Sequence, residues 1–180
     1  MVYILLGNGF EETEAVAPID LLRRAGVEVL TVGLQSKHIT GGHGICLQAD
    51  ITVEEMDLTS LEMIVLPGGL GGVASIRSCR KAMDAIAYAH QSGKLIGAIC
   101  AGPTVLADLK ITDGKKVTCY PGCEEDMGAA LVAEDAACVT DGTVITGTSA
   151  GCAIPFALAL IAALKGQEIA DAIAQQIVIR

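Results

Sequence analysis

The sequence of 180 residues has no tryptophan, and it has only three tyrosines and two phenylalanines. Single-stranded nucleic acids stack their bases on aromatic side chains, so the composition offers no such platform. Basic residues are also scarce, since 12 lysines and arginines stand against 21 aspartates and glutamates, for a formal net charge of −9. Contact with the phosphates of a duplex needs clustered positive charge. We therefore expect no nucleic-acid partner.

Long apolar runs are missing as well. Hydrophobic residues make up 52% of the chain, but none of their runs reaches the roughly 18–20 residues that cross a bilayer. The first segment, "MVYILLGNGFEE", lacks the basic start of a secretory signal and meets acidic residues early. We expect one domain over residues 1–180, a cytoplasmic location and no membrane contact.

The cysteines show no metal-binding spacing. Cys119 and Cys123 are separated by three residues, and neither a second pair nor a nearby histidine completes a zinc set. Without a secretion signal, reduced thiols are expected. We expect no metal and no cofactor, and most cysteines should be small buried residues. The seven are Cys46, Cys79, Cys100, Cys119, Cys123, Cys138 and Cys152.

Short apolar runs alternate with segments of helical periodicity. Continuous apolar runs are typical of strands buried on both faces of a parallel sheet. Such strands are predicted at residues 2–7, 27–33, 63–69 and 95–99, and shorter ones at 116–120, 137–141 and 143–147. Helices are predicted at 11–26, 80–93, 101–110, 151–166 and 167–177, and a hairpin at 36–50. This alternation predicts an α/β sandwich with a mostly parallel sheet.

Cys100 follows the apolar run "LIGAI" and precedes the helical segment "AGPTVLAD". Small residues at Ala98 and Gly102 permit a sharp strand-to-helix turn that exposes a nucleophile. A helix N-terminus beside the sulfur favours the thiolate, so we expect a lowered thiol pKa. The backbone N–H groups of Ala101 and Gly69 are candidates for an oxyanion hole. The alternative is a buried small residue that merely ends a strand.

A carboxylate partner for this thiol is available in "EETE", which follows the first strand. Ligands of open α/β sheets bind beyond the carboxyl ends of the strands, where this segment, the "LPGG" turn and Cys100 all fall. Glu11, Glu12 or Glu14 would then share a proton with the thiol. The alternative is that these acids only stabilise the first turn of a helix.

Several segments resemble the ThiJ/PfpI superfamily, in the branch of the parkinsonism-associated protein deglycase and the bacterial ThiJ-like proteins. They are "GFEETEAVAPIDLLRRAGVEV", "IVLPGG", "LIGAICAGPTVLA", "GKKVTCYPG" and "FALALIAALKG". The resemblance implies a flavodoxin-like three-layer sandwich and a homodimer. It also implies that Cys100 is the reactive cysteine, that Glu14 bonds its sulfur, and that Gly69 and Ala101 supply the oxyanion amides.

The chain departs from the family pattern around the expected pocket. Tyr120 stands where many members carry a histidine, Thr148 where the branch often has an arginine, and His43 roughly where it has another. Peptide cleavage needs a general acid for the leaving amine, so a cysteine protease is not expected. Cys119 and Cys152 are also placed near the pocket, either as resolving thiols or as packing residues.

Two functions fit these residues. The first is a glyoxalase- or deglycase-like enzyme that acts on small reactive carbonyls through the Cys100–Glu14 pair. The alternative is a non-enzymatic sensor of oxidative stress, or a chaperone, that uses the same cysteine.

Overall fold

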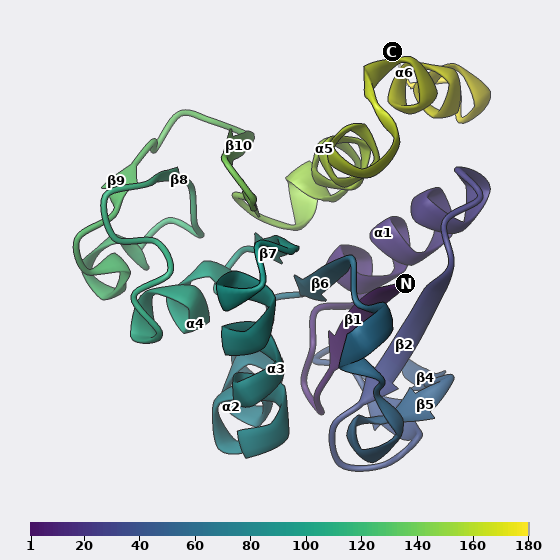
Figure 1. Ribbon diagram of the computed structural model, residues 1–180, viewed down its shortest axis with the longest axis vertical. Helices are drawn as coiled ribbons and strands as arrows, with labels where there is room; N and C mark the ends of the chain where they lie inside the picture. Colours follow the sequence, from purple (N-terminus) through teal and green to yellow (C-terminus); the bar gives the residue numbers. More distant parts are fainter. Residues whose placement is uncertain (180) are drawn as a thin grey trace.

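A central sheet forms the middle layer of the computed structural model, which describes residues 1–179 (Figure 1). Within that range the sheet has seven strands in the order β10-β11-β7-β6-β1-β2-β5, and only the β10–β11 pair is antiparallel. Their bounds are β1 (Val2–Leu6), β2 (Val29–Gly33), β5 (Ile51–Thr52), β6 (Met63–Leu66), β7 (Leu95–Ile99), β10 (Cys138–Asp141) and β11 (Val144–Gly147). The predicted mostly parallel α/β fold is confirmed.

Helices cover both faces of this sheet (Figure 1). On one face lie α1 (Glu12–Arg24), α5 (Ala153–Lys165) and, packed on α5, α6 (Gln167–Gln176). On the other face lie α2 (Leu70–Ser78), α3 (Arg80–Gln91) and α4 (Gly102–Asp108). Short 3-10 turns occupy η1 (Val53–Glu55), η2 (Leu58–Ser60), η3 (Glu124–Met127) and η4 (Ala150–Cys152). The result is the expected three-layer sandwich.

The core divides along the alternation of the strands. In β1, Ile4 and Leu6 face the α1–α5 layer, whereas Tyr3 and Leu5 face the opposite layer, and all four are buried. A strand with apolar side chains on both faces is stable only between two helical layers. The unbroken "VYILL" sequence therefore accounts for the central position of β1.

Two hairpins agree with the sequence. β10 and β11 are joined through Gly142 and Thr143, directly after Asp141, and the φ of +61° at Gly142 suits the glycine of a tight turn. The segment 36–50 forms β3 (His38–Thr40) and β4 (Cys46–Gln48), an antiparallel pair.

Other local predictions were wrong. Only β8 (Lys116–Val117) forms within 116–120, and it pairs in parallel with an unpredicted strand, β9 (Leu131–Val132). Helix α2 was also missed, because two of its nine residues are glycines, which disfavour a helix by about 1 kcal/mol each. Packing of Val73 and Ile76 into the core compensates for that cost.

The register of the parallel strands sets the position of the site. β1, β6 and β7 are neighbours that run in the same direction, so their carboxyl ends lie at one edge of the sheet. The segments that follow them, around Glu14, Gly68 and Cys100, meet at that edge. Among residues 1–179, no helix has the length and apolar character needed to cross a bilayer.

Candidate functional site

Cys100 occupies a strained turn between β7 and α4. Its φ is +64°, and the other non-glycine residues of the described chain with positive φ are Lys110 and Val178. The turn is fixed by hydrogen bonds from the Cys100 N–H to the Gly147 carbonyl and from the Tyr120 N–H to the Cys100 carbonyl, both 2.9 Å. Such a conformation costs about 1–3 kcal/mol and persists only where the surroundings enforce it.

A glycine at position 102 allows this turn to sit against the sheet. A Cβ atom there would lie 2.7 Å from the carbonyl oxygen of Leu66 at the end of β6. Any larger residue would push the first turn of α4 away from that strand. The small residue that suggested an elbow in the sequence is therefore required by the approach of the backbone.

Glu14 comes to the same place from the first turn of α1. Its side chain is fully buried, and its Oε2 accepts a hydrogen bond of 2.8 Å from the Gly68 N–H. A Cβ atom on Gly68 would lie 2.5 Å from Glu14 Oε2, 2.6 Å from Cys100 Cβ and 3.1 Å from Cys100 Sγ. The carboxyl and the thiol thus flank the same glycine. Glu14 Oε1 is buried and accepts no hydrogen bond of ordinary geometry from the described residues.

Burial dominates the protonation of both groups. It raises the pKa of Glu14 to about 7, although the contact with Cys100 and the Gly68 N–H act in the opposite direction. Burial and the negative charge of Glu14 raise the pKa of Cys100 to about 12, although the N–H groups of Ala101 and Gly69 lower it. The prediction of a lowered thiol pKa was wrong, because burial and the carboxylate outweigh the helix N-terminus.

The two groups titrate as one coupled pair. Between the two pKa values the pair holds a single proton, on the sulfur or on the carboxyl. Moving that proton from Sγ to Glu14 creates a thiolate without changing the net charge of the buried site. The backbone N–H groups of Ala101 and Gly69 hydrogen-bond to the sulfur and lower its pKa, so they also favour this thiolate.

Tyr120 and Thr148 differ in how they relate to this pair. Tyr120 bonds Cys100 through its backbone and has a half-exposed side chain. The Thr148 hydroxyl is engaged by Thr118 Oγ1 at 2.9 Å and donates to the Ala136 carbonyl. The Thr148 hydroxyl is therefore occupied by Thr118 and Ala136 and not by the Cys100–Glu14 pair.

The other two predicted cysteines lie in separate surroundings. Cys119 is buried in a small cluster with Val117 and Met127. Cys152 lies near Cys138, whose thiol pKa is raised to about 12 by burial and, to a smaller extent, by Cys152.

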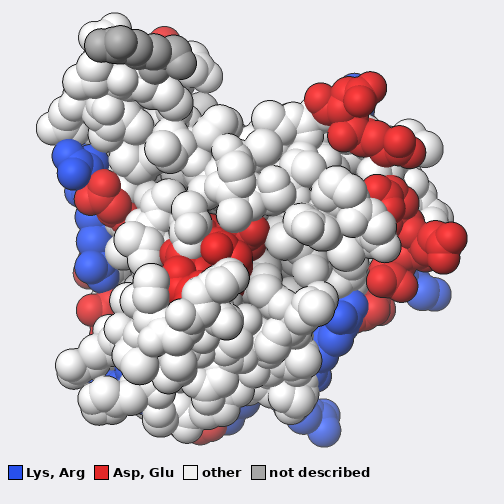
Figure 2. All heavy atoms as spheres, turned by 180° about the vertical axis from the view of Figure 1, so that it is seen from behind, with Lys and Arg blue, Asp and Glu red and all other residues white. Residues whose placement is uncertain are grey.

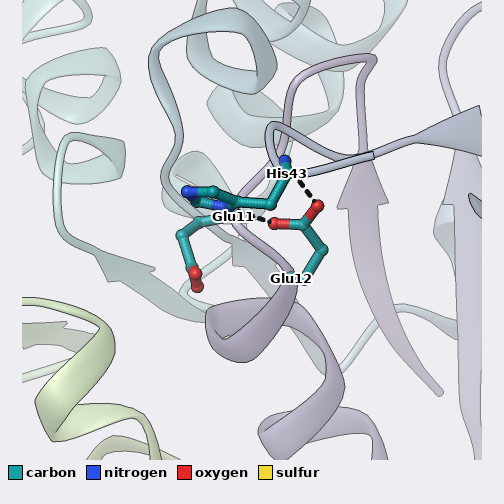
Figure 3. A group of neighbouring side chains, drawn as sticks. All are labelled: Glu11, Glu12 and His43. Carbon is teal, nitrogen blue, oxygen red and sulfur yellow. Dashed lines mark hydrogen bonds and ion pairs between the residues drawn. The ribbon is translucent and has the colours of Figure 1, made fainter. Parts of the chain in front are cut away.

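The sequence reasoning missed a contact between the start of α1 and the β3–β4 hairpin (Figure 3). The buried Glu12 carboxylate accepts a 2.7 Å bond from the His43 N–H through Oε1, and its Oε2 lies 2.8 Å from His43 Nδ1. Hydrogen bonding to Glu12 raises the pKa of His43. Burial alone would raise the pKa of Glu12, but its bonds with His43 lower it. The only sequence signal was the glycine pair at 41–42, which permits a close approach.

Charge is distributed unevenly over the surface. Figure 2 shows acidic side chains in a hollow near the centre of one face and along one edge, whereas lysines and arginines lie toward the periphery. Among the described residues, no lysine or arginine forms an ion pair with Glu11, Glu12 or Glu14.

Comparison with known proteins agrees with this architecture. The model of the DJ-1/PfpI family matches residues 1–163. The chain belongs to the DJ-1/PfpI family. The predicted ThiJ/PfpI membership is thereby confirmed.

Relatives within the DJ-1/PfpI family differ in length. Two Arabidopsis thaliana proteins, DJ-1 homologs B and A, are 30% and 32% identical over 99% of this chain, which spans 41% and 46% of their lengths. A Pyrococcus abyssi protein named a deglycase is 32% identical, over 83% of this chain and 90% of its own. The solved structure of oxidized Toxoplasma gondii DJ-1 is 32% identical, covers 98% of this chain and 97% of its own, and has a TM-score of 0.93.

Replacing Glu14 tests the electrostatic coupling in this family member. Glu14→Gln removes the negative charge that raises the pKa of Cys100, so the thiolate fraction at a given pH should increase. We expect alkylation of Cys100 by iodoacetamide at about pH 8 to be roughly tenfold faster, with its pH midpoint lowered. Peptide mass spectrometry follows Cys100 separately from the other thiols. Glu28→Gln is the control, and a slower or unchanged rate in Glu14→Gln would refute the coupling.

Proposed function

We propose that this DJ-1/PfpI protein is an enzyme for small reactive carbonyls, of the glyoxalase or deglycase type. The observation that carries the proposal is the buried Glu14 carboxyl, which meets the Cys100 thiol across Gly68. A relative 32% identical to this chain is named a deglycase, which supports the same chemistry here.

The pair is suited to addition at an aldehyde. The Cys100 proton moves to Glu14, and the sulfur attacks the carbonyl carbon to form a C–S bond. The electron pair of the C=O bond moves to oxygen, where the N–H groups of Ala101 and Gly69 are positioned beside the sulfur to stabilise the charge. Glu14 then returns the proton to that oxygen, which completes a hemithioacetal. With a pKa of about 7, Glu14 both accepts and donates a proton near neutral pH.

Hydrolysis of peptides is a poorer fit. A departing amine must be protonated by a general acid. Tyr120 occupies the place of the family histidine and approaches Cys100 through its backbone N–H, so this position supplies no imidazole. The chemistry is therefore proposed for carbonyls, whose addition needs one proton carrier, and we assign no cofactor to it.

Turnover of methylglyoxal tests the enzyme. The wild type should consume it, Cys100→Ser should abolish consumption, and Glu14→Gln should slow it by about 100-fold or more because the proton carrier is lost. In the Glu14→Gln variant, Cys100 is thus expected to be alkylated faster, whereas methylglyoxal should be consumed more slowly. Cys46→Ser, at an exposed thiol, is the matched control. An inactive wild type, or an active Cys100→Ser variant, would contradict the proposed enzyme.

A second function, sensing of oxidants, is favoured by the free Glu14 Oε1. This oxygen is buried without a hydrogen-bond partner among the described residues, and it lies in the carboxyl that meets Cys100. Two molecules of hydrogen peroxide would convert the thiol to a sulfinic acid, each transferring one oxygen and leaving as water. A protonated Glu14 would donate a hydrogen bond to the sulfinate. The related Toxoplasma gondii DJ-1 structure is described as oxidized.

Controlled peroxide treatment tests this second function. Cys100 should stop at the sulfinate in the wild type and should proceed to the sulfonate in Glu14→Ala, which has no hydrogen-bonding side chain at this position. Peptide mass spectrometry distinguishes these states. A disulfide from Cys100 to Cys119 or Cys152 would instead favour the resolving role over the packing role, the two alternatives that the sequence left open. Oxidation of other cysteines before Cys100 would contradict the sensor.

We further propose that the protein is a cytoplasmic homodimer. The location is the one expected from the sequence. The dimer is supported by an apolar strip on and beside α1, in which Val16, Ile45 and Ile154 are 44%, 56% and 40% exposed. Val16 and Ile45 line one shallow groove, and Ala17 connects it to a second groove that contains Ile154. Exposed apolar side chains that adjoin in this way are typical of association surfaces.

A charged residue in the strip tests the dimer. Val16→Glu places a carboxylate near Glu12 and Asp20 in the groove, and a partner that covers this strip would have to remove the new charge from water beside two existing carboxylates. Light scattering after size exclusion should give twice the chain mass of 18.5 kDa for the wild type and the single mass for Val16→Glu. Ile169→Glu, on α6, is the control. A monomeric wild type would exclude the dimer.

A further inference from the structure

Glu11, Glu12 and His43 form a compact set of metal-binding groups. One potential ligand atom from each lies within 4.8 Å of the others. The carboxylates come from the N-terminal end of α1, and the imidazole comes from the turn between β3 and β4 (Figure 3). The Cys100–Glu14 chemistry does not use this set, although Glu12 also lines the groove of Val16 and Ile45.

The surrounding backbone orients the Glu12 carboxylate. The N–H groups of His43 and Ile45 donate to its Oε1 at 2.7 and 3.4 Å, which leaves Oε2 directed to the His43 ring. A Cβ atom on Gly41 would lie 2.3 Å from the same Oε1, so the hairpin closes on this carboxylate only because the residue is glycine. The ligand is thus held before any cation arrives.

Glu11 and His43 can each still offer a ligand atom to a metal. Glu11 Oε2 accepts the Glu14 N–H at 2.7 Å, which leaves its other oxygen available. The His43 side chain is 75% exposed, so its ring can move without disturbing the core. Its Nδ1 lies 2.8 Å from Glu12 Oε2, whereas two ligands of one tetrahedral zinc ion are about 3.3 Å apart. A shift of about half an ångström brings this pair to the spacing of zinc ligands, and the Glu11 carboxylate, whose ligand atom lies within 4.8 Å of the other two, closes on the same ion by a side-chain movement.

The local charge favours a cation. Glu11 and Glu12 are adjacent carboxylates, and among the ion pairs of residues 1–179 the one partner of either is His43. Elsewhere on the surface, the exposed acids Asp20, Asp50 and Asp108 are each paired with an arginine. This part of the surface therefore carries negative charge that no lysine or arginine compensates.

We propose that Glu11, Glu12 and His43 bind a divalent transition-metal cation. Imidazole nitrogen with carboxylate oxygens is a ligand set that zinc accepts, and water would complete the coordination. The expectation of no metal came from cysteine spacing, which does not report on this site. The cation would lie beside the first turn of α1 that carries Glu14, because the Glu11 carboxylate accepts the Glu14 N–H at 2.7 Å.

Calorimetric titration with zinc chloride tests the site without any turnover assay. The protein is the full chain carrying Cys100→Ser, which removes the thiol proposed to be reactive. One zinc ion should bind, and His43→Ala and Glu11→Gln should each weaken binding by at least about tenfold. Glutamine keeps the oxygen that caps α1 and removes the charge. His38→Ala, on the same hairpin, should bind like the parent.

Cobalt substitution identifies the ligand atoms. Nitrogen and oxygen ligands should give only weak visible bands, without the intense near-ultraviolet band of a cobalt–thiolate bond. Circular dichroism confirms that each variant is folded. Zinc affinity unchanged in His43→Ala, absence of zinc binding by the parent, or a thiolate band would each overturn the proposal. None of these results depends on activity toward carbonyls.

Discussion

The site depends on one buried hydrogen bond, from the Gly68 N–H to Glu14 Oε2. It connects the turn after β6 to the first turn of α1, and the carboxyl that it holds meets the Cys100 thiol after β7. Three segments far apart in sequence are thereby tied at one edge of the sheet. A carboxyl removed from water keeps its proton to higher pH, and the pKa of Glu14 is accordingly about 7. The site contains a proton carrier because the fold buries it.

Glycines make this arrangement sterically possible. A side chain at Gly68 would overlap both Glu14 and Cys100, and one at Gly102 would overlap the β6 backbone. Gly41 serves the Glu12–His43 contact in the same way. At each of these positions, a functional group or backbone from another segment fills the space that a Cβ atom would need. Close approach, rather than turn flexibility, explains why glycine is needed there.

Periodicity predicted the architecture well where segments were long and apolar. β1 and β7 are unbroken apolar runs, and α5 is a long apolar segment that ends at Gly166, so local sequence and burial agree. The prediction failed at α2, whose two glycines disfavour a helix, and at β9, whose two residues are too few to show a period. The place of Cys100 between a strand and a helix was predictable, since small neighbours and an apolar run mark such a turn. The raised pKa of Cys100 was not predictable, because burial of the thiol and its proximity to the Glu14 charge arise only in the assembled fold.

The sequence by itself determined the α/β class, the turn that presents Cys100 and the family to which the chain belongs. These properties follow from local periodicity and from the order of motifs along the chain, and neither requires knowledge of contacts between distant segments. The pattern of residues left Glu11, Glu12 and Glu14 open, and only the family resemblance singled out Glu14; the tertiary structure gives the physical basis for that choice. It directed Glu14 inward to Gly68 and Cys100, Glu12 to the His43 turn, and Glu11 to the cap of α1. The physical reason is the helix geometry of α1, whose successive side chains point in different directions, together with the distinct partners that the folded chain places around them.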